Sequence, residues 1–199
     1  MANVKYLTSE LAKIPVDKRE VLRYMGAKES TDELAALIDE CIAEAVGAIS
    51  AKLCFDEYAV SIDESEVDID FCKVKSKDFA KNLNGTNKAV VFAATVGLGI
   101  DRLISKYSRL SPSKALCIGA IGNERVEALC NLFCDELKEK YKKTHPRYSA
   151  GYGDLYLSVQ RDIFKALDCT KNIGISLSDS LLMTPTKSVT AIVGIESGD

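Results

Sequence analysis

The segment from His145 to Tyr156 holds the residues best suited to binding a ligand. Arg147 stands four residues before Gly151, which opens a Gly151-Tyr152-Gly153 turn. Glycine lets the backbone approach a ligand closely and adopt positive φ. Arginine offers a carboxylate charged hydrogen bonds of about 1.5 to 3 kcal/mol each, and tyrosine adds a flat apolar face with a polar tip. The segment predicts a site for a zwitterionic, ring-bearing ligand; the alternative is that Arg147 only pins its own loop by bonding backbone carbonyls.

Two other patterns could carry chemistry, and we favour structural interpretations of both. Gly97-Leu98-Gly99 resembles the start of a dinucleotide loop, but the third glycine of that motif would fall on Arg102. A tight strand-to-helix turn explains both glycines.

Cysteine spacing is the second pattern. Cys130 and Cys134 are four apart on a predicted helix, yet His145 is the single histidine and structural zinc needs four ligands. We therefore expect no metal site, a loop role for His145 without catalytic duty, and buried core positions for the thiols Cys41, Cys117, Cys130 and Cys134.

Composition limits the class of protein. The 199 residues suit one domain, and a net charge of −3 argues against a nucleic-acid partner. Seven cysteines without a pairing pattern indicate reduced thiols and a cytoplasmic location. Neither an apolar secretory core near Met1 to Leu7 nor a run of about 18 to 20 apolar residues is present, so we expect no export signal and no membrane association.

Hydrophobic periodicity predicts a helical first third. Asp17 and Glu20 have capping-box spacing ahead of a short helix that Gly26 can end, and Ser30 with Glu33 repeats the start signal. Apolar residues then predict a helix from Thr31 to Leu53. Alternation predicts strands at 58–62 and 67–71.

The rest of the chain mixes both element types. We expect helices at 77–83, after Gly97, from Ser111-Pro112 to about Tyr141, and at 155–167. We expect strands at 89–96, 173–177 and 188–195, and a shaped loop at 142–154. Without regular βαβ alternation, this order predicts an α+β fold with a mostly antiparallel sheet.

Three segments resemble the activation domain of cobalamin-dependent methionine synthase. Arg147-Tyr-Ser-Ala-Gly151-Tyr152 resembles the family's Arg-x-x-x-Gly-Tyr-Pro motif. The stretch from Leu177 to Thr190, with Met183 and Pro185, resembles its Leu-Thr-(Glu/Asp)-Ser…Met-x-Pro…Ser-Val segment. Glu127 in Arg125-Val-Glu-Ala falls on the helix where the family has a glutamate that contacts S-adenosylmethionine.

The resemblance implies a single C-shaped domain over residues 1–199, around a twisted sheet, with an N-terminal helical segment (1–53) packed on it. It implies that Arg147 holds the carboxylate of S-adenosylmethionine, that Glu127 faces its positive charge and that Ser149 offers backbone groups beside Gly151. Tyr152 would lie between the methyl donor and the corrin ring. No residue is implied as a catalytic acid or base.

The implied function is repair of a partner. Cobalamin would be carried by a methionine synthase chain, reduced by a donor such as flavodoxin or ferredoxin, and methylated from S-adenosylmethionine. Three departures from the family stand out: Gly153 replaces the motif's proline and would loosen the turn, Thr184 replaces a tryptophan, and the sequence ends at Asp199 where the fused domain continues.

Two other functions fit the residues. One is a ligand-binding or interaction module for a corrinoid protein that keeps the fold without S-adenosylmethionine-dependent activity. The other is an autonomous methyltransferase with a small acceptor, which we rank last because no base or nucleophile accompanies the loop.

Overall fold

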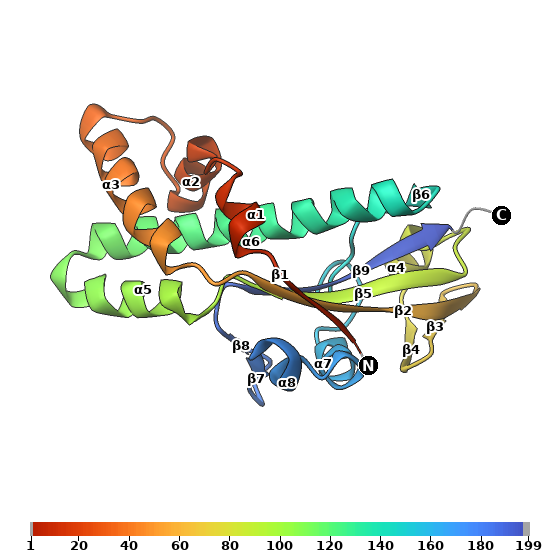
Figure 1. Ribbon diagram of the computed structural model, residues 1–199. Helices are drawn as coiled ribbons and strands as arrows, with labels where there is room; N and C mark the ends of the chain where they lie inside the picture. Colours follow the sequence, from red (N-terminus) through yellow and green to blue (C-terminus); the bar gives the residue numbers. More distant parts are fainter. Residues whose placement is uncertain (1, 197–199) are drawn as a thin grey trace.

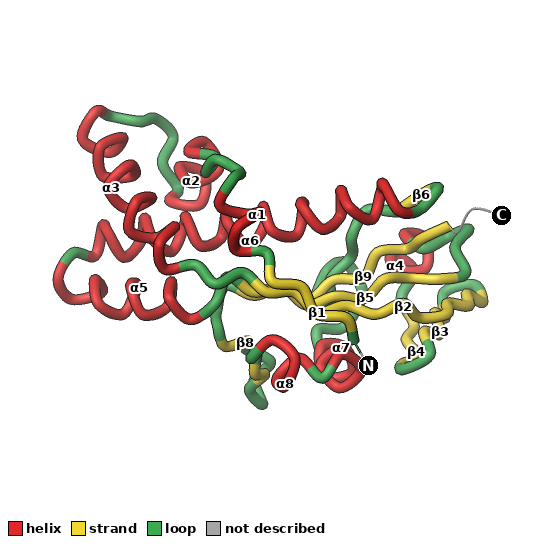
Figure 2. Tube along the Cα trace, viewed as in Figure 1, coloured by secondary structure: helices red, strands yellow, loops and turns green. Residues whose placement is uncertain are grey.

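The computed structural model describes residues 2 to 196, so the predicted consequence of the end at Asp199 lies outside the described residues. Figure 1 shows a strongly twisted sheet with a long helix, α6 (Pro112–Lys140), along one face and shorter helices below the other. Figure 2 shows that the helices of the N-terminal part gather beside α6 at one end of the sheet. The predicted α+β class with a mostly antiparallel sheet is confirmed.

Seven strands form the main sheet. Six follow the order β4-β3-β2-β5-β9-β6, and β1 pairs with the first four residues of β2. All pairs are antiparallel. The strands are β1 (Asn3–Tyr6), β2 (Lys52–Asp63), β3 (Glu66–Ile69), β4 (Cys72–Lys75), β5 (Lys88–Thr95), β6 (Lys143–Thr144) and β9 (Ser188–Glu196). A separate hairpin pairs β7 (Ser176–Leu177) with β8 (Met183–Thr184).

The helices divide between the two faces of the sheet. The other helices are α1 (Thr8–Ala12), α2 (Lys18–Met25), α3 (Asp32–Ala48), α4 (Lys77–Asn82), α5 (Leu98–Leu110), α7 (Val159–Leu167) and α8 (Cys169–Ile173). On β9, Ala191, Val193 and Ile195 point into the core beneath α6, whereas Ile192 points into the core beneath α7 and α8. The two hydrophobic cores therefore lie on opposite faces of β9. Successive side chains of this strand point alternately into one core and the other.

Local signals at helix ends are confirmed in part. The predicted caps at Ser30 and Ser111 are wrong, because Thr31 caps α3 and Ser111 makes no side-chain cap hydrogen bond. Asp17 accepts hydrogen bonds from the amides of Arg19 and Glu20, and Gly26 ends α2 with a φ of 74°. The predicted return bond from Glu20 is absent, because the amide of Asp17 donates to Glu124 instead at 3.2 Å. Pro112 occupies the first turn of α6 as expected.

The Gly97 turn is also as predicted. Gly97 has a φ of 85°, and a Cβ on Gly99 would lie 2.0 Å from the carbonyl oxygen of Ala48. The two glycines let α5 start tightly against the end of α3, which is a packing role and not a phosphate loop.

The predicted helix to Leu53 is wrong at its C-terminal end. α3 is capped by Thr31 and ends at Ala48. The amide of Ser50 donates to Val96 at 2.9 Å and that of Ala51 to the hydroxyl of Thr8, so tertiary partners pull the chain into β2. Leu53 is therefore a strand residue.

The predicted strand at 173–177 is wrong in its first half. Residues Cys169 to Ile173 form α8, which Gly174 ends with a φ of 74°, and only Ser176 and Leu177 pair as β7. The helix predicted from Leu155 starts at Val159. Strands β1 and β4 were not predicted.

Candidate functional site

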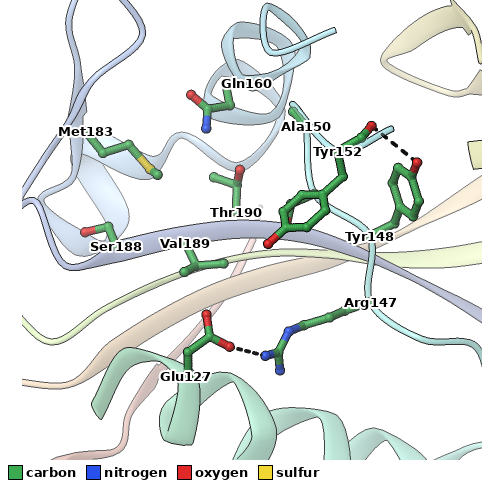
Figure 3. A pocket seen from close by; sticks show the side chains of 11 residues that line it. Glu127, Arg147, Tyr148, Ala150, Tyr152, Gln160, Met183, Ser188, Val189 and Thr190 are labelled. Carbon is green, nitrogen blue, oxygen red and sulfur yellow. Dashed lines mark hydrogen bonds and ion pairs between the residues drawn. The ribbon is translucent and has the colours of Figure 1, made fainter. Parts of the chain in front are cut away.

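The predicted ligand residues meet at a cavity of about 330 Å³ beside β9. Glu127 comes from α6, and Arg147 and Tyr152 come from the loop between β6 and α7 (Figure 3). Ser149 belongs to the same loop. The remaining wall residues are Tyr148, Ala150, Gln160, Met183, Ser188, Val189 and Thr190. Of the five predicted site residues, Gly151 alone does not line the cavity.

Arg147 is bound to α6 and not to its own loop. Its guanidinium forms an ion pair with Glu127 and donates to Asn131 at 2.7 Å (Figure 3 shows the ion pair). The alternative in which Arg147 bonds carbonyls of its own loop is therefore wrong. The two charged groups predicted to hold a ligand neutralise each other in this structure.

The loop that carries Arg147 is held in shape by its neighbours. Gly151 has a φ of 92°, and its amide donates to Leu155 at 2.9 Å. Asp154 accepts hydrogen bonds from the hydroxyl of Ser76 and from the amides of Lys77 and Asp78. These donors, led by Ser76, hold the pKa of Asp154 below its usual value. The carboxylate therefore fastens the loop to the start of α4.

Gly153 does not loosen the turn, contrary to the sequence expectation. Its φ is 51°, and a Cβ there would lie 2.5 Å from the Asp78 carboxylate and 2.5 Å from the Tyr148 hydroxyl. That hydroxyl donates to the carbonyl of Tyr152 at 3.3 Å. The proline of the family motif, with φ fixed near −65°, has no place in this turn.

Tyr152 projects from the rim of the cavity with 69% of its surface exposed. Its ring packs edge to face on Tyr148 at 6.5 Å between centroids. The Tyr152 ring therefore offers exposed aromatic surface at the rim.

The cavity follows a free stretch of strand edge. The amide and carbonyl of Ile192 both bond Tyr148, at 2.8 Å each, while the carbonyl of Lys187 accepts from Val96 on the opposite side. Backbone groups alternate in direction along an antiparallel strand, so those of Ser188 and Thr190 point the same way as those of Ile192. Among residues 2 to 196 no strand pairs with this edge before Ile192. Unpaired main-chain donors and acceptors thus face the cavity.

Two side chains in the wall carry polar atoms with no partner. Gln160 is 7% exposed and Thr190 2%, yet the Gln160 side-chain oxygen and the Thr190 hydroxyl bond no other described group. The sequence did not single out either residue, because a glutamine on an amphipathic helix and a threonine on a strand are both commonplace.

A second groove, of about 700 Å³, adjoins the cavity and shares Glu127. It lies between α6 and the segment from Ile14 to Tyr24. Arg125 fixes that segment: its guanidinium pairs with Glu124 and donates to the carbonyls of Ile14 at 2.7 Å and Pro15 at 3.1 Å. The N-terminal segment thereby forms one bank of the groove, with Asp17 on it.

The thiols near the site are not ionised at neutral pH. Burial raises the pKa of Cys130 to about 12 and also raises that of Cys134, although the neighbouring Arg147 acts against it at Cys134. Cys41, Cys117 and Cys130 are buried as predicted, whereas Cys134 is partly exposed. His145 bonds the carbonyl of Asn82 through its Nδ1 at 2.6 Å, away from the cavity.

None of the helices described between residues 2 and 196 combines the length and apolar character needed to cross a membrane. Among those residues, too, no three His, Cys, Asp or Glu side chains are grouped as metal ligands would be.

Comparisons with known proteins give a structural match and a family match. The structure is similar to one described as the crystal structure of the MetH reactivation domain bound to AdoHcy, with a TM-score of 0.76 and 12% sequence identity, over 100% of this chain and 79% of that one. At such low identity the likeness shows the fold. No curated protein matches the sequence. The family model for the vitamin B12 dependent methionine synthase activation domain matches residues 16–197, and the chain therefore belongs to that family.

Proposed function

We propose that this chain binds S-adenosylmethionine in the cavity beside β9 and supports the reductive methylation of cob(II)alamin on a cobalamin-binding methionine synthase chain or a related corrinoid methyltransferase. The observation that carries the proposal is the Arg147–Glu127 ion pair in the cavity wall. Arg147 is presented there by a loop that Gly151 bends. S-adenosylmethionine carries a carboxylate, an ammonium and a sulfonium. One arginine and one acid are the smallest complement for these charges.

The chemistry belongs to the two substrates. One electron from an external donor, such as flavodoxin or ferredoxin, reduces the partner's corrinoid, and the methyl group of S-adenosylmethionine is then transferred to it, leaving S-adenosylhomocysteine. The structural relative is described as bound to AdoHcy, and this supports a site of the same kind in this chain. This chain supplies positioning, which lowers the entropic part of the barrier, and excludes bulk water.

Each predicted residue has a distinct task in this proposal. Arg147 binds the ligand carboxylate, and Glu127 faces the ammonium or the sulfonium. Ser149 offers main-chain groups, and Gly151 sets the bend that presents them. Tyr152 faces the docked cobalamin, which accords with its exposure. As a domain arrangement we propose one unit over residues 1–199. Within the segment 1–53, β1 and the start of β2 belong to the sheet, and only the helices α1, α2 and α3 pack on it.

A reactivation assay tests the function. The partner in its cob(II)alamin form is mixed with a reductant, S-adenosylmethionine and this chain, and the corrinoid absorption spectrum is followed. We expect methylation that requires all four components. An unchanged spectrum with every component present would refute the proposal.

Calorimetry tests the binding site separately. Arg147→Ala is expected to weaken S-adenosylmethionine about 10- to 150-fold, since charged hydrogen bonds contribute about 1.5 to 3 kcal/mol. Arg161→Ala is the matched control: Arg161 lies on α7 outside the cavity and donates to the carbonyl of Asp179 at 2.8 Å. The affinity of the Arg161→Ala variant for S-adenosylmethionine should equal that of the parent.

A second candidate is a fold-retaining module that docks on a corrinoid protein without using S-adenosylmethionine. The mutual neutralisation of Arg147 and Glu127 favours it, and so does Thr184 in place of the family's tryptophan. The absence of any S-adenosylmethionine binding to the parent, together with binding to the corrinoid chain, would support this candidate over the first.

A further inference from the structure

The two unpartnered polar groups at the cavity are unusual for a protein interior. Buried polar atoms are nearly always hydrogen-bonded, because an unpaired one loses its bonds to water without replacement. Of the four side chains with such atoms among the described residues, two, Asn82 and His145, lie outside the cavity wall. The other two, Gln160 and Thr190, both line the cavity. Their coincidence at one cavity points to a ligand that supplies the missing partners.

These two groups lie apart from the charged pair. Figure 3 shows Gln160 and Thr190 on one side of β9 and Glu127 and Arg147 on the other. The parity of the strand explains this, since Thr190 shares the direction of Ile192, toward α7, whereas Val189 is directed toward α6. The cavity therefore wraps around the free strand edge, with a charged end and a neutral end.

The neutral end is suited to groups that both donate and accept hydrogen bonds. A hydroxyl offers one donor and two acceptor positions, and a side-chain amide offers two donors and an acceptor. Gln160 and Thr190 carry no charge, and Met183 adds an apolar surface beside them. Such a set suits ribose hydroxyls or the edge of a purine, and does not suit a carboxylate or an ammonium.

We propose that Gln160 and Thr190 bind the nucleoside half of S-adenosylmethionine, while Arg147 and Glu127 bind its amino-acid half. This assignment rests on the proposed function and fixes the direction of the ligand across β9. Both residues are specificity-determining, because they favour an adenosyl ligand over a free amino acid that could satisfy the charged end alone.

Variants that remove the polar atoms while keeping shape test the assignment. Thr190→Val and Gln160→Met are titrated by ligand-observed NMR, which reads weak affinities, with S-adenosylmethionine and with its two halves, methionine and 5′-methylthioadenosine. Each variant is expected to weaken S-adenosylmethionine and 5′-methylthioadenosine about two- to tenfold and to leave methionine unchanged. Arg147→Ala is expected to weaken S-adenosylmethionine and methionine and to leave 5′-methylthioadenosine unchanged.

A second threonine supplies a matched control. Thr95 is 1% exposed, and its hydroxyl bonds Gly97 at 3.1 Å and Ser188 at 2.9 Å. Thr95→Val is expected to lower the melting temperature and to leave ligand affinity at the parent value. Thr190→Val is expected to leave the melting temperature at the parent value and to lower ligand affinity, because the Thr190 hydroxyl has no protein partner to lose.

The outcomes separate this inference from the proposed function. If Thr190→Val weakens methionine as much as S-adenosylmethionine, or if neither variant changes any affinity, the assignment is overturned while S-adenosylmethionine binding stands. If the parent binds no S-adenosylmethionine, both the function and the assignment are overturned.

Discussion

Restoring the family's proline at position 153 is expected to damage this protein. Gly153 has a φ of 51°, and a Cβ added there would lie 2.5 Å from both the Asp78 carboxylate and the Tyr148 hydroxyl. For Gly153→Ala, the left-handed backbone costs about 1 to 2 kcal/mol, and displacing the hydrogen bond from Tyr148 to Tyr152 costs about 0.5 to 1.5 kcal/mol more. The free energy of unfolding should fall by about 1.5 to 3.5 kcal/mol. Gly153→Pro should lower the free energy of unfolding further, since the proline ring excludes positive φ.

Thermal denaturation followed by circular dichroism measures these effects. A loss of about 1.5 to 3.5 kcal/mol corresponds to a fall in melting temperature of about 3 to 14 °C for a protein of this size. Gly174→Ala is the matched control, because Gly174 has a φ of 74° and nothing within 4 Å of a Cβ. It should show the backbone cost alone. If Gly153→Ala is no more destabilising than Gly174→Ala, or if Gly153→Pro raises the melting temperature, the steric argument is refuted.

Three further predictions concern other parts of the molecule. Arg125→Met leaves Glu124 as a buried charge and frees the carbonyls of Ile14 and Pro15, so urea denaturation should show a loss of about 3 to 5 kcal/mol; parental stability would contradict the role of this ion pair. The pKa of Asp154 is lower in the folded state than its value of about 3.9 in the unfolded chain. Asp154 therefore stabilises the fold fully at pH values above about 3.9, and this stabilisation is lost as the pH falls through the folded pKa. Melting temperatures of Asp154→Asn should therefore vary less than those of the parent below about pH 4, and parallel profiles would contradict this. Tyr152→Ala should slow reactivation about tenfold with S-adenosylmethionine affinity unchanged, while Tyr152→Phe behaves as the parent; equal rates for all three would remove Tyr152 from the docking surface.

Elements with strong local signals could be predicted from the sequence. The start of α2 carries the capping residue Asp17, α6 begins with Pro112, and the centre of β5 is a continuous apolar run because helices cover both faces of the sheet. The errors arise where tertiary contacts override the local pattern. Leu53 keeps the helical phase of α3, but Ser50 and Ala51 are bound by Val96 and Thr8.

Short elements gave the other errors. Ile173, Ile175 and Leu177 alternate as a strand would, yet Ile173 ends α8 and the chain turns at Gly174. A two-residue strand such as β6 has too few residues to show a period at all.

The site divides in the same manner. Its charged end could be proposed from Arg147 and the neighbouring glycines, because rare residue types at fixed spacing are visible in a sequence. Its neutral end could not, because the significance of Gln160 and Thr190 lies in burial without partners, which only the packed structure reveals. Nor does a sequence indicate that Arg147 and Glu127 pair with each other.

That pair has a consequence for how ligand binding responds to ionic strength. A ligand that inserts a carboxylate and an ammonium between Arg147 and Glu127 replaces one ion pair by two. These two groups bring no net charge into the site, so their contribution to affinity should change little between low and moderate salt. A simple anion would occupy Arg147 and leave Glu127 uncompensated, and its weaker binding would decline steeply as salt is added. If the proposed function holds, the internal ion pair would favour ligands that carry both signs of charge over plain carboxylates and phosphates.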